Sequence, residues 1–228
     1  MKDEFNGFQD ETLKFLAELK LNNSREWFDE NRDRYEKYLM EPARKFVIAI
    51  GDRLKEIFPE IRAEPKVNKS LFRMNRDIRF SPDKSPYKTN LGIIFPEGPR
   101  KRMECPGFYF HLEEDSLMLA GGMYMIPKDL LDPYRQVVAK EQPAKELAKI
   151  LKKAEKDGIE IGGLHYKRIP RGFSEEHPYS FLLKHNGVYG METTKVPDEL
   201  FSKELLDYSL ERFLRIDPMN RWFLKYLF

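Results

Sequence analysis

The sequence is poor in cysteine and has no long apolar run, and each scarcity excludes a class of protein. Its single cysteine, Cys105, cannot form an intramolecular disulfide, which argues against a disulfide-stapled secreted domain and fits a reducing compartment. No stretch has the length and apolar character of a membrane span. The N-terminal residues are not followed by an apolar run of the signal-peptide kind, so we expect a cytoplasmic protein that does not associate with membranes.

An excess of charge of one sign is also missing. Lys and Arg number 40 against 38 Asp and Glu, which leaves a net charge of +2. This balance argues against a protein that coats DNA through a large positive field, although it allows a local basic patch. A chain of 228 residues is more often one large domain than two.

The spacings that mark common metal and nucleotide sites are absent from the sequence. The four histidines are His111, His165, His177 and His185. No two of them have the i, i+4 spacing of a helical zinc site, and there is no Cys-x-x-Cys, Walker A or Gly-x-Gly-x-x-Gly pattern. We therefore expect neither a metal nor a cofactor.

Apolar periodicity predicts that the N-terminal third is helical. Residues 8–19 and 46–57 each carry an apolar stripe at helical spacing, and Trp27 and Phe46 are expected in the core. Between the stripes we expect a second helix that continues to Leu39, with Asn23 as its N-cap and Glu26 reaching back in a capping box.

Strand alternation dominates the middle of the chain. Residues 91–95, 108–112 and 116–125 predict strands, the last two joined in a hairpin by the acidic turn 113–115. Gly121-Gly122 predicts a bulge or a close approach, most often by a helix packed on the sheet. Helices are predicted at 127–139 and 143–157, a short helix at 179–184, a strand at 188–193, and a last helix from Pro197 that Pro218 interrupts or restarts. Helices around a central group of strands predict one α+β domain over residues 1–228, with a mainly antiparallel sheet flanked by N-terminal and C-terminal helices.

The stretch richest in chemistry is residues 73–88. It holds five cationic side chains, Arg73, Arg76, Arg79, Lys84 and Lys88, with the carboxylates Asp77 and Asp83 and the aromatics Phe80 and Tyr87. We expect a strand over Ser70 to Met74 followed by an extended loop, because Pro82 and Pro86 break regular structure. Arginine forks match two oxygens of a carboxylate or phosphate at once, so this stretch is a candidate anion-binding segment.

This segment resembles a family of uncharacterised bacterial proteins, known as conserved hypothetical proteins. The family signature is Arg-x-x-Arg-Asp-x-Arg-Phe, a short gap, and then Asp/Asn-Lys-x-x-Tyr-Lys-x-His. The chain matches it at Arg73, Arg76, Asp77, Arg79, Phe80, Asp83, Lys84, Tyr87 and Lys88, and has Asn90 where the signature has histidine. Further resemblance lies in Phe15-Leu16, Asn22-Asn23, Trp27-Phe28 and Pro170-Arg171-Gly172-Phe173. The resemblance implies a domain of unknown function and brings no established activity.

A second basic stretch, residues 167–173, carries Lys167 and Arg171 in a loop shaped by Pro170 and Gly172. We expect it to fold beside the first, so that the cations of both segments bind a small ligand bearing phosphate or carboxylate; a solvated charged loop is an equal alternative. If the site is catalytic, Asp77 is the candidate general base and Tyr87 the candidate acid.

Two alternatives to a small-ligand site stay open. In one, the basic stretch binds nucleic acid with Phe80 or Tyr87 as stacking aromatics. In the other it is an internal salt-bridge network in a structural or interaction protein, and we expect Asp77 to pair with at least one neighbouring arginine. The substrate, the oligomeric state and any protein partner are not indicated by the sequence.

Overall fold

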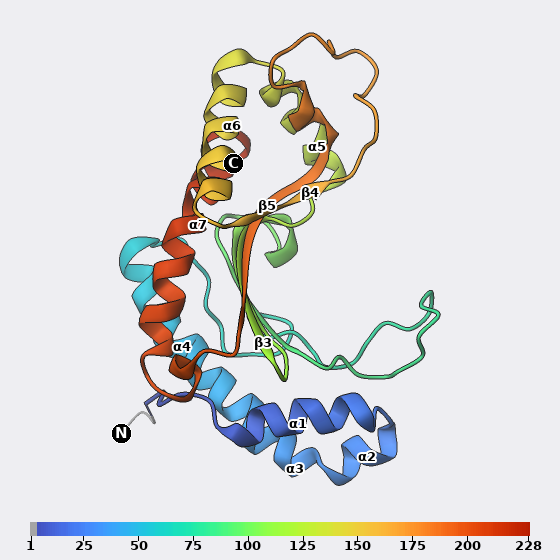
Figure 1. The fold of residues 1–228 in the computed structure, drawn as a ribbon, viewed down its shortest axis with the longest axis vertical. Helices are drawn as coiled ribbons and strands as arrows, with labels where there is room; N and C mark the ends of the chain where they lie inside the picture. The colour runs from blue at the N-terminus through green and yellow to red at the C-terminus, as the bar shows by residue number, and fades with distance from the viewer. Residues whose placement is uncertain (1–3) are drawn as a thin grey trace. The chain divides into compact units, whose positions relative to one another are not determined.

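The computed structural model describes residues 4–228. Residues 1–3 lie outside the described residues, and they belong to the N-terminal stretch for which the sequence predicts no signal peptide. The fold is α+β, as predicted, and the described residues form one five-stranded antiparallel sheet in the order β1-β2-β3-β5-β4 (Figure 1). The strands are β1 (Leu91–Pro96), β2 (Gly107–Leu112), β3 (Ser116–Met123), β4 (Glu160–Leu164) and β5 (His185–Lys195).

Helices lie before β1, between β3 and β4, and at the C-terminal end of the chain. They are α1 (Asp10–Leu21), α2 (Arg25–Glu30), α3 (Arg32–Arg34), a π-helix (Tyr35–Met40), α4 (Glu41–Ile57), α5 (Lys128–Val138), α6 (Glu141–Lys156) and α7 (Leu205–Leu227). Short 3₁₀ helices lie at Arg102–Glu104, Ser180–Lys184 and Asp198–Phe201. Among residues 4–228, none of the helices combines the length and the apolar character that a membrane-spanning segment requires.

The chain divides into two compact units. Unit 1 consists of Met1–Phe95, Tyr109–Leu119 and Thr193–Glu211, and unit 2 of Pro96–Phe108, Ala120–Glu192 and Arg212–Phe228. Strands β1, β2, β3 and β5 contain residues of both units. Each unit has apolar residues buried in its own interior.

The core of unit 1 is aromatic. Phe46 of α4 is fully buried and its ring lies 4.8 Å from that of Phe110 on β2, measured between ring centroids. Phe8 stacks on the same Phe110 ring at 6.1 Å, and Phe5 meets Phe46 at 5.3 Å. Burial of such rings stabilises by about 1.5–3 kcal/mol each, so this cluster fixes α4 and the segment before α1 on β2.

Unit 2 is built around a second apolar cluster. Tyr134 of α5 is buried beside Trp222 and Phe223 of α7, and its hydroxyl donates to the Leu182 carbonyl at 3.0 Å. The Trp222 indole donates to the Pro143 carbonyl at 3.0 Å. Both polar ends are therefore satisfied where the rings are buried, as buried polar groups require.

Several predictions about the N-terminal helices were wrong in detail. The cap of α2 is Ser24 rather than Asn23: the Ser24 hydroxyl accepts from the Trp27 N–H at 3.2 Å, so the predicted capping box with Glu26 does not form. The predicted single helix is divided at Asn31 and becomes a π-helix before α4. Trp27 is half-buried rather than in the core, whereas Phe46 is buried as predicted.

The edge next to β1 also differs from the prediction. No strand forms over Ser70 to Met74; instead Leu71 makes a single bridge to Ile93, with the Phe72 N–H donating to the Gly92 carbonyl at 3.0 Å. After Phe72 the chain turns away from the sheet edge, so pairing stops.

In the C-terminal half β4 was missed, because Gly162 and Gly163 interrupt its alternation. The last helix begins at Leu205 after a 3₁₀ turn, and Pro218 lies inside it without ending it.

The close approach predicted at Gly121-Gly122 is confirmed. A Cβ on Gly121 would lie 2.9 Å from the Ile216 side chain of α7, and one on Gly122 would lie 2.5 Å from the Val188 carbonyl oxygen. The Gly122 N–H donates to the Asn220 side chain at 2.9 Å. Gly122 also has φ of +117°, a conformation that glycine adopts without strain. At Gly121 the cause is therefore the predicted one, a helix packed directly on a strand, whereas Gly122 closely approaches the backbone of β5.

Candidate functional site

The basic stretch forms a narrow loop whose two arms are joined at the base. We call residues 73–88 the basic finger. Asn75 and Tyr87 form an antiparallel bridge, the Arg76 N–H donates to the Pro86 carbonyl at 2.8 Å, and the Lys88 N–H donates to the Met74 carbonyl at 2.7 Å. Figure 1 shows the finger as a long teal-green loop that extends well away from the strands and the N-terminal helices of unit 1.

The base of the finger is fastened to the helices of unit 1 through Tyr87. The Asn23 amide donates to the Tyr87 carbonyl at 3.0 Å and accepts from the Tyr87 N–H at 3.0 Å, so one side chain pairs with a backbone as a neighbouring strand would. The Tyr87 ring is buried and stacks on Phe28 of α2, with ring centroids 4.0 Å apart. The finger therefore leaves the fold from a rigid base.

The charges at the tip are paired within the finger. Arg79 donates from Nε and Nη2 to the two oxygens of Asp77 at 2.9 and 2.7 Å, and Arg76 pairs with Asp83. The Lys84 ammonium donates to the Ile78 carbonyl at 3.0 Å. The predicted pairing of Asp77 with a neighbouring arginine is thus confirmed.

These ion pairs and hydrogen bonds lower the pKa values of the two carboxylates in the finger. The Arg79 side chain and then its backbone N–H lower the pKa of Asp77 to about 2, from an ordinary value of 3.8. Hydrogen bonds from the Ser85 hydroxyl and backbone, followed by the one from Arg76, lower the pKa of Asp83. Both carboxylates lie at the surface, where such pairs add little to stability and are screened by salt. The charged side chains of the tip are therefore held in place by ion pairs, but each can exchange its partner for another charged group at little cost.

Phe80 projects from this charged tip. Its side chain is 93% exposed, and the Arg79 guanidinium lies 5.8 Å from its ring centroid. Arg73 and Lys84 are also exposed. The tip thus presents an exposed aromatic ring with Arg79 and Lys84 in the same loop, whereas Arg73 lies at the base.

The structure adds no support to the two proposed catalytic roles within the finger. Asp77, with its pKa lowered, is a weak proton acceptor at neutral pH, and the Tyr87 ring lies buried against Phe28. Both roles stay predictions.

The second basic stretch belongs to unit 2, whereas the finger belongs to unit 1. Lys167 and Arg171 are exposed, and the loop is held by Ile169 and Phe173, which pack against the unit 2 core. Gly172 has φ of +90°, as the predicted tight turn requires. The convergence of the two stretches stays a prediction.

A second polar cluster, which the sequence analysis did not identify as a site, lies on the outward face of β2. Tyr109, His111 and Glu113 follow one another at every second position, and Asn90 reaches His111 from the segment before β1. The 109-111-113 alternation is visible in the sequence, but the contact with Asn90 depends on the pairing of strands. Asn90 is the position at which the family signature has histidine.

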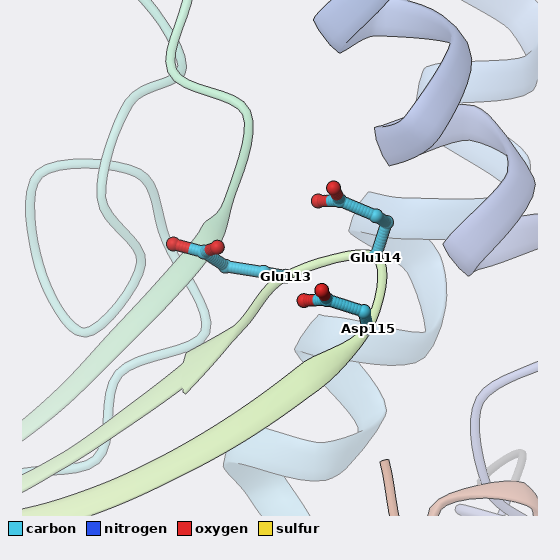
Figure 2. A group of neighbouring side chains, drawn as sticks. All are labelled: Glu113, Glu114 and Asp115. Carbon is cyan, nitrogen blue, oxygen red and sulfur yellow. The ribbon is translucent and has the colours of Figure 1, made fainter. Parts of the chain in front are cut away.

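The acidic turn between β2 and β3 is the place where carboxylates gather. Figure 2 shows Glu113, Glu114 and Asp115 on this turn. One ligand oxygen from each of the three lies within 4.8 Å of the others. Glu114 pairs with Lys20, and Glu113 contacts His111. Among residues 4–228 these three carboxylates form the group that could hold a cation, but such groups are common on exposed turns without a bound metal.

The comparison with protein families decides the relationship. The family model of conserved hypothetical proteins DUF2461 matches residues 11–222. The chain belongs to this family. As a DUF2461 protein it carries the basic finger within the matched region, together with the β2 cluster. Comparison with curated proteins and with solved structures gives no significant match.

Proposed function

We propose that this DUF2461 protein binds single-stranded nucleic acid through the tip of the basic finger. The observation that carries the proposal is the 93% exposure of Phe80 beside the Arg79 guanidinium. An isolated exposed apolar side chain is ordinary, but this one stands in a segment with five cations and two carboxylates. Stacking aromatics set among cations are how proteins bind single strands without reading sequence.

The ion pairs of the tip are compatible with this role. The Arg79–Asp77 pair is solvated, so a phosphate can replace the Asp77 carboxylate at the guanidinium fork with little loss. The fastened base at Asn23 and Phe28 keeps the tip extended, which lowers the ordering cost of binding. The balanced net charge of the chain supports weak, salt-sensitive binding by a local patch.

A small ligand bearing phosphate or carboxylate is the second candidate. It is favoured by the same Arg79 fork, whose two donors already hold both oxygens of a carboxylate. Unlike a single strand, such a ligand does not need the Phe80 ring.

Binding of a fluorescent thymidine oligonucleotide, followed by anisotropy at low salt, tests the first proposal. Phe80→Ala should weaken binding roughly 5- to 150-fold, since stacking contributes about 1–3 kcal/mol per base. Tyr124→Ala, which removes another exposed aromatic (64% exposed) outside the finger, is the matched control and should bind as the wild type does. Equal affinity of Phe80→Ala and wild type would contradict stacking.

The same variants separate the second candidate. If a small anion is the ligand, inorganic phosphate should raise the melting temperature of wild type and Phe80→Ala equally and that of Arg79→Met not at all. A wild-type melt that does not respond to phosphate, nucleotides or sugar phosphates removes the small-ligand candidate.

A further inference from the structure

The outward face of β2 holds a chain of three hydrogen-bonding side chains. The Tyr109 hydroxyl lies 3.0 Å from His111 Nδ1, and His111 Nε2 lies 3.0 Å from Glu113 Oε1. Tyr109 and His111 share one face of β2 because side chains alternate along a strand, and Glu113 follows in the turn directly after it, while Phe108, Phe110 and Leu112 are buried on the other face. His111 is 22% exposed and Glu113 41%, so the chain of groups reaches solvent.

The partners of His111 fix its tautomer. A carboxylate only accepts hydrogen bonds, so Nε2 carries the proton that it donates to Glu113. Nδ1 is then an acceptor, and it receives the Tyr109 hydroxyl and, at 3.3 Å, the Asn90 amide. The imidazole lone pair is therefore directed at the Tyr109 proton, with a carboxylate behind it to stabilise the imidazolium.

The surroundings of the Tyr109 hydroxyl leave room for it and place a positive charge on its side of the sheet. A Cβ on Gly92 would lie 2.7 Å from the hydroxyl oxygen, so glycine makes the space. The Tyr109 ring meets Phe72 edge-on at 5.8 Å, and the Lys88 ammonium lies 5.0 Å from the Phe72 ring centroid. Lys88 is thus separated from Tyr109 by the Phe72 ring, and its positive charge beside that ring favours an anionic substrate.

From this geometry we propose that Tyr109, His111 and Glu113 form a nucleophilic relay that acts on phosphate esters. The Tyr109 oxygen forms a bond to phosphorus while its proton passes to His111 Nδ1; the bond from phosphorus to the leaving oxygen, on the opposite side, breaks, and that oxygen takes a proton from water. Water then forms a bond to phosphorus and loses a proton to solvent, the bond from phosphorus to the Tyr109 oxygen breaks, and that oxygen takes back the proton held by His111. Tyr109 and His111 are the catalytic residues, and Glu113 positions the imidazole. The proposal does not rest on nucleic-acid binding by the finger.

Labelling of the whole protein by an alkyl phosphonyl fluoride tests the relay without a known substrate. Attack by a tyrosine oxygen forms an oxygen–phosphorus bond and releases fluoride, and mass spectrometry of peptides gives the rate at each tyrosine. Tyr109 is half-buried, whereas Tyr124 is 64% exposed, so exposure alone favours Tyr124. We expect Tyr109 to be labelled at least about tenfold faster than Tyr124, because a positioned base accelerates proton removal.

Variants then separate chemistry from accessibility. His111→Gln should lower the Tyr109 rate at least about tenfold, and Glu113→Gln should lower it in part, with Glu113→Asp restoring some of the loss. The rate at Tyr124 should stay constant in every variant, which controls for the reagent, and an unchanged melting temperature reports an intact fold. Labelling of Tyr109 no faster than Tyr124, or a Tyr109 rate unchanged in His111→Gln and Glu113→Gln, would overturn the proposal.

Discussion

At the scale of single residues, the charges of the finger do not pair with their nearest neighbours in sequence. Asp77 stands next to Arg76 in sequence, yet it pairs with Arg79. The Arg79 N–H also donates to the Asp77 side chain at 3.3 Å, so a local turn of the backbone brings Asp77 and Arg79 together. Arg76 finds Asp83 across the loop, a partner that only the fold of the finger provides. Sequence alone therefore predicted that Asp77 is paired, but not the identity of each pair.

The burial of single residues was also predicted only in part from the sequence. The helical period predicted that both Trp27 and Phe46 are core residues, and Phe46 is fully buried among rings of unit 1. Trp27 is half-buried because α2 is one short turn whose inward position is taken by Phe28. The period predicts the buried face of a long helix well and that of a short one poorly.

His185 gives a pH dependence of stability. Burial lowers its pKa below the ordinary 6.5, against the opposing effect of its hydrogen bond to the Phe181 carbonyl. The unfolded chain therefore takes up a proton as the pH falls through 6.5 while the folded chain does not, so stability is lost below that pH.

We expect the urea midpoint of the wild type to fall from pH 7 towards pH 5, and the fall to be smaller in His185→Gln. An identical pH dependence in the two proteins would show that His185 is not the group responsible.

At the scale of elements, most helices and strands were predictable from the sequence, whereas their caps and exact ends were not. The hairpin of β2 and β3 and helices α1, α4, α5 and α6 follow from their periodicity. The cap of α2 was misassigned because Asn23 and Ser24 are both good caps, and the choice depends on Tyr87, which lies 64 residues after Asn23. A contact with a residue far along the chain therefore decides which of two equally suitable residues caps a helix.

Asn23 is expected to anchor the finger to the helices. Asn23→Ala removes two hydrogen bonds to the Tyr87 backbone in a partly buried place, and should lower the free energy of unfolding by about 1–3 kcal/mol. Asn22→Ala, at the neighbouring exposed position, is the control and should cost less, about 1 kcal/mol or below. Urea unfolding measures both, and a smaller loss for Asn23→Ala than for Asn22→Ala would refute the anchor.

At the scale of the whole molecule, the sequence predicted the fold class correctly. For the function it left three candidates: binding of a small anion, binding of nucleic acid, and an internal salt-bridge network. The α+β class follows from the order of periodic segments, and residues 11–222 match the DUF2461 family. A net charge of +2 hides the uneven distribution that matters, an excess of three positive charges over residues 73–88. The exposure of Phe80 and the contact of Asn90 with His111 depend on tertiary structure, so no local pattern revealed them.

The salt dependence of oligonucleotide binding tests the central claim, that the finger is the binding element. If Arg73, Arg79 and Lys84 each contact a phosphate, the logarithm of the association constant should fall against the logarithm of salt concentration with a slope of roughly −2. The double variant Arg79→Met, Lys84→Met should reduce the slope to roughly −0.7, and Lys167→Met with Arg171→Met, in unit 2, should leave it unchanged. A wild-type slope near zero, or the same slope in the finger variant, would contradict the claim.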